Sequence, residues 1–332
     1  MKKIWIGVVV ILVAVAGALV LYRVQKPRGE PLVMRMRAEA GQPRVPLGEA
    51  GLDPAAIQQA VDYAASHGST ALLIGRGGHI VFEKYWDSTT FDTPVDPGFA
   101  PALLALAVGS ALEDRLIASL DVPLANYLPD LPQPESAFTT RELLARDHDL
   151  PLDRAADLLA LTLEHLTQQP YQTLVAQRVW QPLGGGDLEF LKMPGPLRPQ
   201  GVSAACCIRA RVGDWMRVAE ALANDGIFEG NQLTPPRYVV MMLRPAHRDA
   251  TRGYFTRVDG NFAAHDTAWL EGTKGQRLWV VPSLRLTILR LGTEPSADWD
   301  PAMIPNTIVR GTSGWKSATP GAGVDPNLYA PH

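Results

Sequence analysis

Cysteine is nearly absent from this chain of 332 residues, which contains only the neighbouring Cys206 and Cys207. Two adjacent cysteines cannot link distant parts of a fold, so no disulfide framework is expected. Their number also says nothing about the redox compartment. Because the surrounding stretch is apolar, the pair is interpreted as small buried hydrophobic residues rather than as nucleophiles.

Long runs of a single charge sign are also missing. The 31 Lys and Arg residues against 34 Asp and Glu residues give a net charge of −3, without the basic footprint of a nucleic-acid binder. Nucleic acid is therefore not expected as a partner. Hydrophobic residues make up 46% of the chain and charged residues 20%, which excludes wholesale disorder. The length predicts one large domain, or two intertwined subdomains, together with any membrane segment.

One long apolar run stands at the start of the chain. Residues 4–22 read IWIGVVVILVAVAGALVLY without a charge, between Lys2 and Lys3 on one side and Arg23 on the other. This length can span a bilayer, so residues 1–26 are predicted to form a transmembrane anchor. A cleaved signal peptide is the rival interpretation, but the apolar run continues past both cleavage-like sites. Counting positive charges alone places the body in the cytoplasm.

The remainder divides into three parts. Residues 27–47 are rich in proline and arginine and are predicted to form a linker between membrane and body. Residues 48–311 carry the periodic segments of a folded domain, and residues 312–332 are predicted to be a flexible tail. No internal repeat is present.

The order of predicted elements defines the fold class. A helix capped by Asp53 precedes a β-hairpin that turns at residues 76–78, and a second hairpin spans residues 276–291. Helical patterns dominate the segment between the hairpins. The prediction is an α/β (α+β) fold in which an antiparallel sheet is flanked by helices, with an all-helical lobe of about residues 100–200 inserted beside it. A cleft is expected between the two parts.

Several stretches together resemble the β-lactamase-related serine hydrolases, which include class C β-lactamases, penicillin-binding proteins, esterases and aminohexanoate-oligomer hydrolases. These stretches include GGHIVFEKYW, VGSALEDRLIASLDVPLANYLPDL, TTRELLARDHDL and EGTKGQRLWVVPSLRLTILRLG, within residues 51–310. The resemblance implies the same fold, with an active site between sheet and lobe. Since such proteins usually act outside the inner membrane, it also implies a single-pass protein of the bacterial inner membrane with a periplasmic body, against the charge count.

The first catalytic motif of this family is missing at its expected place. Ser-x-x-Lys sets a lysine amine one helical turn from the serine hydroxyl that it activates. By resemblance, Gly98 stands at the serine position and Pro101 at the lysine position, and neither can perform the role. The only lysine with a serine three residues before it is Lys316, after Ser313, in the predicted tail.

The other two family motifs are also altered. The second motif, Tyr-x-Asn or a variant, falls by resemblance at Pro151 and Asp153. The third is a strand motif such as Lys-Thr-Gly, and residues 272–276 (GTKGQ) stand in its place. Lys274 could offer a cation to the cleft, and the alternative is a solvated lysine in a tight turn.

Two His-Asp pairs, formed by His148 and His265 with the aspartates that follow them, map by resemblance near the cleft rim. A histidine with carboxylates can bind a metal or act as an acid and base, although such residues are more often polar loop groups. No Gly-x-Ser-x-Gly elbow, His-Glu-x-x-His motif or phosphate loop occurs. Neither a cofactor nor a metal is expected.

The functional expectation combines a recognisable frame with missing motifs. It is a membrane-anchored, non-catalytic binding or scaffolding module whose cleft could hold a small-molecule or cell-wall ligand. One alternative is an active esterase or amidase that uses a non-standard site around Lys274, His148 or His265. Another alternative is a structural subunit of a membrane complex.

Overall fold

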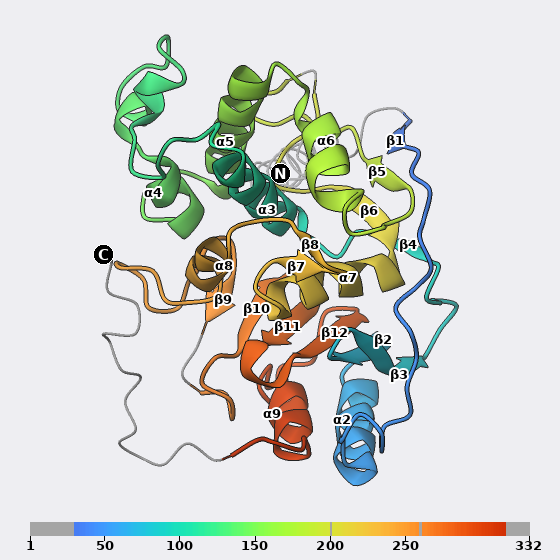
Figure 1. The fold of residues 1–332 in the computed structure, drawn as a ribbon. Coiled ribbons are helices and arrows are strands. Elements are labelled where there is room, and N and C mark those ends of the chain that lie inside the picture. Colours follow the sequence, from blue (N-terminus) through green and yellow to red (C-terminus); the bar gives the residue numbers. More distant parts are fainter. Residues whose placement is uncertain (1–29, 200, 259–260, 317–332) are drawn as a thin grey trace, which may run out of the picture.

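The computed structural model describes residues 30–199, 201–258 and 261–316. A central sheet with helices on both faces lies beside a helical lobe (Figure 1). Every strand pairing within its sheets is antiparallel, so the predicted α+β class is confirmed. The predicted transmembrane segment lies outside the described residues. No helix within the described ranges has the length and apolar character needed to cross a bilayer.

The central sheet joins the two predicted hairpins. In spatial order its strands are β3 (His79–Tyr85), β2 (Ser69–Arg76), β12 (Leu286–Gly292), β11 (Arg277–Val281), β10 (Ala268–Glu271) and β9 (Arg257–Val258). The β2–β3 turn is made by Gly77 and Gly78, with φ of 58° and 86°, as a tight hairpin turn of two residues requires. Pairing of β2 with β12 brings the two ends of the domain into one sheet.

Two apolar layers sandwich this sheet. Helices α2 (Pro54–Ser66) and α9 (Met303–Arg310) pack against each other and cover one face, burying Ile57, Trp279 and Ile308 between them and the strands. Asp53 starts α2 as predicted, because its side chain accepts a hydrogen bond from the Ala55 amide. Helix α7 (Val212–Ala223) covers the opposite face and separates the sheet from the lobe (Figure 1).

The lobe contains the helices predicted for the middle of the chain. They are α3 (Ala100–Glu113), α4 (Thr140–Ala145), α5 (Leu152–Thr167) and α6 (Tyr171–Leu174), the last of which continues into a π-helical segment, Val175–Trp180. Helix α8 (Pro236–Met242) contacts α3 from below in the view of Figure 1. Eleven residues of α3 are buried, so this apolar helix forms the centre of the lobe.

A second, smaller sheet closes the side of the lobe. Its order is β1 (Leu32–Met34), β5 (Leu188–Phe190), β6 (Ile208–Arg211) and β4 (Pro94–Val95). A short hairpin, β7 (Ile227–Phe228) and β8 (Asn231–Gln232), follows α7. Because β4 leads directly into α3, this sheet fixes where α3 begins.

The predicted linker, residues 27–47, is not a free spacer from residue 30 onward. Strand β1 pairs with β5, and the buried Arg217 donates to the carbonyls of Glu39 and Ala40. The segment continues along β3, where the Val45 amide donates to the Ile80 carbonyl. These contacts satisfy backbone groups and need no apolar periodicity in the sequence. For that reason the composition of this segment resembles that of a spacer.

The start of the predicted tail is also held against the body. Ser313 accepts a hydrogen bond from Arg76 through its hydroxyl, and its amide donates to the Gly51 carbonyl. The Trp315 indole donates to the Ala263 carbonyl. The Ser-x-x-Lys sequence of residues 313–316 therefore belongs to the α2–α9 side of the sheet. Residues 317–332 lie outside the described residues.

Candidate functional site

A small pocket lies where sheet and lobe meet. Its volume is about 110 Å³, and it is lined from the lobe by Pro101, Arg146 and Leu152. The sheet side contributes Glu271 and Arg257, and the segment before β9 adds Arg252, Gly253, Phe255 and Thr256. Pro101 stands at the family's lysine position, and Leu152 lies between the two positions of the second motif. The pocket therefore occupies the place where the resemblance puts an active site.

Backbone contacts surround Gly98, the position that the resemblance assigns to the nucleophile. Gly98 has φ of 87°, and its amide donates to the Asp96 carboxylate at 3.0 Å. The Thr273 amide donates to the Pro97 carbonyl at 3.1 Å, which joins the residues before α3 to the end of β10. A Cβ added at Gly98 would stand 3.0 Å from the Thr273 nitrogen. A serine here would need the Thr273 backbone to give by a few tenths of an ångström, in a backbone conformation that side chains disfavour.

The turn that carries Lys274 is held by a buried arginine. Arg290 is 0% exposed, and its guanidinium donates to the carbonyls of Lys274 and Gly275 at 3.2 and 3.0 Å. Burial lowers its pKa to about 10. Lys274 has φ of 54° and an exposed side chain that does not line the pocket. The structure thus places Lys274 as a solvated turn residue, the alternative interpretation.

The second-motif positions begin a helix. Pro151 is the N-cap residue of α5, and Asp153 lies exposed in its first turn. Neither side chain lines the pocket, whereas Leu152 between them does. At this position the pocket is therefore lined by the apolar side chain of Leu152 and not by a group that can transfer a proton.

The hydroxyl and the carboxylate that line the pocket are already engaged. The Thr256 hydroxyl donates to the Met242 carbonyl. The Glu271 carboxylate accepts from Arg257 at 2.8 Å and from Arg277 at 2.9 Å. Burial alone would raise the pKa of Glu271, but these two hydrogen bonds outweigh it and hold the pKa below its usual range. Neither residue forms the nucleophile and base pair that acyl transfer requires.

Of the two candidate histidines, His148 is half-buried close to the pocket and His265 is exposed. His148 Nδ1 accepts from the Leu150 amide at 3.0 Å, and burial, together with the charge of Arg146, lowers its pKa. His265 precedes β10 and Lys274 follows it, so these two candidates lie beyond opposite ends of that strand. The aspartate beside His265 accepts from the Ser283 amide and hydroxyl.

The three candidates are thus not brought together. Lys274, His148 and His265 all lie outside the residues that line the pocket. In the described ranges, no three His, Cys, Asp or Glu side chains come close enough to hold a metal ion.

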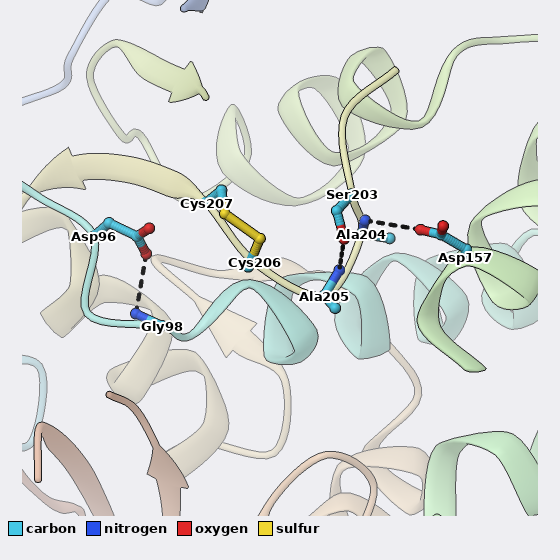
Figure 2. Close-up of a disulfide and its surroundings, with 8 residues drawn as sticks. All are labelled: Asp96, Gly98, Asp157, Ser203, Ala204, Ala205, Cys206 and Cys207. Carbon is cyan, nitrogen blue, oxygen red and sulfur yellow. Dashed lines mark hydrogen bonds between the residues drawn. A yellow bond between two sulfur atoms is a disulfide. The ribbon is translucent and has the colours of Figure 1, made fainter. Parts of the chain in front are cut away.

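The adjacent cysteines form a disulfide that the sequence interpretation missed. Cys206 and Cys207 are bonded to each other directly before β6. Strand β6 pairs with β4, which precedes the Asp96–Gly98 turn. Figure 2 accordingly shows the disulfide between the Asp96–Gly98 turn and the segment 203–205. The only sequence signal for it was adjacency, and adjacency alone does not distinguish a disulfide from two thiols.

A buried carboxylate anchors the approach to this disulfide. Asp157 on α5 is 0% exposed and accepts from the amides of Leu197 and Ala204, both at 3.2 Å. The second of these bonds is drawn in Figure 2. Burial raises the pKa of Asp157. The segment that carries the disulfide is therefore tied to the lobe by α5 and to the smaller sheet by β6.

Comparisons with known proteins support the fold alone. No family model matches the chain, and no curated protein matches it. A protein described as a 6-aminohexanoate-dimer hydrolase from Bacillus anthracis superposes with a TM-score of 0.66 at 14% identity, covering 83% of this chain and 88% of that one. FmtA from Staphylococcus aureus gives a TM-score of 0.62 at 13% identity, covering 86% and 93%.

A penicillin-binding protein homologue from Caulobacter crescentus gives a TM-score of 0.59 at 12% identity, with coverage of 77% and 97%. The chain therefore has the fold of β-lactamases and penicillin-binding proteins. The resemblance inferred from the sequence is confirmed at this level.

Substitution of Gly98 tests the closed nucleophile position. Gly98→Ala adds a left-handed backbone cost of about 1 kcal/mol and a contact on the Thr273 backbone, and overpacking of this kind costs about 1 to 3 kcal/mol more. Gly230 has φ of 84° with nothing within 4 Å of an added Cβ, so Gly230→Ala is the matched control. Urea unfolding should show the larger loss for Gly98→Ala. Equal losses of unfolding free energy in the two variants would mean that the Thr273 backbone moves away from the added Cβ at little cost.

The lowered pKa of His148 predicts a pH-dependent stability. The unfolded chain binds the proton more tightly, so stability is full above the ordinary histidine pKa of 6.5 and falls as pH drops below it. His148→Gln removes the group that titrates. The difference in unfolding free energy between the native chain and the variant should therefore decrease below pH 6.5. His265→Gln, at an exposed site, is the control. An advantage that grows on acidification would contradict the burial argument.

Proposed function

We propose that this chain is a membrane-anchored protein that uses a β-lactamase-like fold as a non-catalytic binding or scaffolding module. The observation that carries the proposal is the closed contact at position 98. There a glycine stands at the position that the resemblance assigns to the nucleophile, and an added Cβ would lie 3.0 Å from the Thr273 nitrogen. The pocket beside it contributes Pro101, an engaged threonine and a neutralised glutamate.

Covalent labelling tests the absence of acyl-transfer chemistry. Purified protein is exposed to a fluorescent penicillin and to a fluorophosphonate probe, with intact mass as the readout. The expected result is an unmodified mass, because no serine with an activating base lines the pocket. A penicillin-binding protein labelled in parallel shows that the probes are competent.

The competing hypothesis of an active esterase or amidase makes the opposite prediction. It requires stoichiometric labelling at one serine, or turnover of nitrophenyl acetate that is lost in Lys274→Ala, His148→Ala or His265→Ala. Either result would remove the non-catalytic role. A background rate that is the same in all three variants would support that role.

Membrane anchoring rests on the uncharged run of residues 4–22 and is tested by fractionation. The full chain is expected to stay in the membrane pellet after washing with alkaline carbonate, whereas a variant lacking residues 2–26 should be released. With the body on the periplasmic side, protease added to spheroplasts should digest it. Recovery of the full-length gene product as a shortened soluble protein would favour a cleaved signal peptide instead.

A further inference from the structure

The pocket between sheet and lobe gathers positive charge. Three of its lining residues are Arg146, Arg252 and Arg257, which come from the end of α4, the segment before β9 and β9 itself. Two acidic groups face this cluster. Glu271 is shared between Arg257 and Arg277, and Asp249 pairs with Arg252 at 2.9 Å. With Arg146, four arginines thus share two carboxylates, and the charge of one arginine on the pocket wall has no carboxylate partner.

Arg146 carries that charge. Within the part of the chain that the structure describes, no carboxylate lies within ion-pair distance of it, and its Nε is buried without a hydrogen-bond partner. Burial and the neighbouring charges of Arg252 and Arg257 lower its pKa. A guanidinium with a buried, unpaired donor beside two other cations costs free energy in the empty protein. An anion in the pocket would remove that cost.

The backbone fixes where this arginine stands. Arg146 ends α4 with φ of 60°, and its amide donates to the carbonyls of Glu142 and Leu143. Glycine is the usual residue at a left-handed helix end, because a side chain there carries a conformational cost. These two hydrogen bonds fix the main chain at Arg146, and the side chain therefore starts from a fixed point beside the pocket.

Apolar side chains complete much of the lining. Pro101, Leu152 and Phe255 line the pocket together with the charged groups. A volume of about 110 Å³ lies below the range of pockets that enclose drug-sized ligands, which limits the occupant to a small anion and excludes a polymer. Guanidinium groups bind carboxylate and phosphate oxygens through paired hydrogen bonds.

We propose that this pocket binds a small organic anion, with the carboxylate or phosphate head group held by Arg146 together with Arg252 and Arg257, and with the apolar part against Pro101, Leu152 and Phe255. The inference rests on the proposed non-catalytic role, because it takes the pocket as a binding site rather than a reaction centre. No covalent step is involved.

Titration calorimetry with benzoate and phenyl phosphate tests the proposal, with benzamide as the neutral control of matching shape. The anions should bind at millimolar concentrations or below and benzamide should not, since charge rather than apolar area drives the affinity. Comparison of the two anions distinguishes a carboxylate ligand from a phosphate ligand. Failure of both anions to bind, or equal binding of benzamide, would overturn the proposal.

Matched variants locate the site. Arg146→Gln should weaken anion binding about tenfold or more, as the loss of charge-assisted hydrogen bonds predicts. Arg248→Gln changes an exposed arginine that pairs with Asp147 outside the lining and should leave the affinity within about twofold. Equal weakening in both variants would reduce the effect to general electrostatics and overturn the site assignment.

A thermal scan separates binding from a structural role of Arg146. Removing an unpaired cation from between two others should leave the melting temperature of the empty Arg146→Gln protein unchanged or raised, while abolishing the shift that anion produces in the native chain. A lowered melting temperature would make Arg146 a structural residue and overturn the proposal.

The two proposals fail separately. Serine labelling by the activity probes overturns the non-catalytic role, whereas an unlabelled protein that binds no anion overturns only the ligand assignment.

Discussion

The hydrogen bond between the Thr273 amide and the Pro97 carbonyl is the constraint around which the cleft is arranged. It fastens the residues before α3 to the end of β10, and glycines at 98 and 272 allow the two backbones to meet. A Cβ at Gly272 would lie 1.9 Å from the Pro97 carbonyl oxygen. Because the lobe begins with α3, this contact also sets the position of the lobe against the sheet. The space left over is the pocket beside Pro101.

Buried charged groups reinforce the same junction from several sides. Arg290 fixes the β10–β11 turn through backbone carbonyls, and Arg217 fastens the N-terminal segment to the body in the same way. Asp157 fixes the segment that leads to the disulfide through backbone amides. In each case a buried ionic group is satisfied by several backbone partners, which makes its burial tolerable and couples segments far apart in the sequence. Arg146 differs because its Nε has no such partner.

The comparison with solved structures and the local chemistry carry different information. The shared fold at 12 to 14% identity reflects the same stacking of sheet and helices, which many sequences can satisfy. Function depends on a few side chains in the cleft, and the pocket here is lined by a proline and a group of arginines. A fold shared with hydrolases therefore says little about what this cleft holds, and the arginines are the more direct guide to it.

Local patterns in the sequence determined the helices and both hairpins. Propensity, capping and turn chemistry act over a few residues and can be read directly from the chain, as Asp53 and the Gly77–Gly78 turn illustrate. Only the tertiary structure decided which candidates meet. It separated Lys274 from His265, left His148 outside the lining, held residues 30–47 against the body and joined Cys206 to Cys207. It also assembled Arg146, Arg252 and Arg257, which are up to 111 residues apart, at one pocket. Packing between segments that are far apart in the sequence brings these residues together. Their spacing along the chain does not predict this packing.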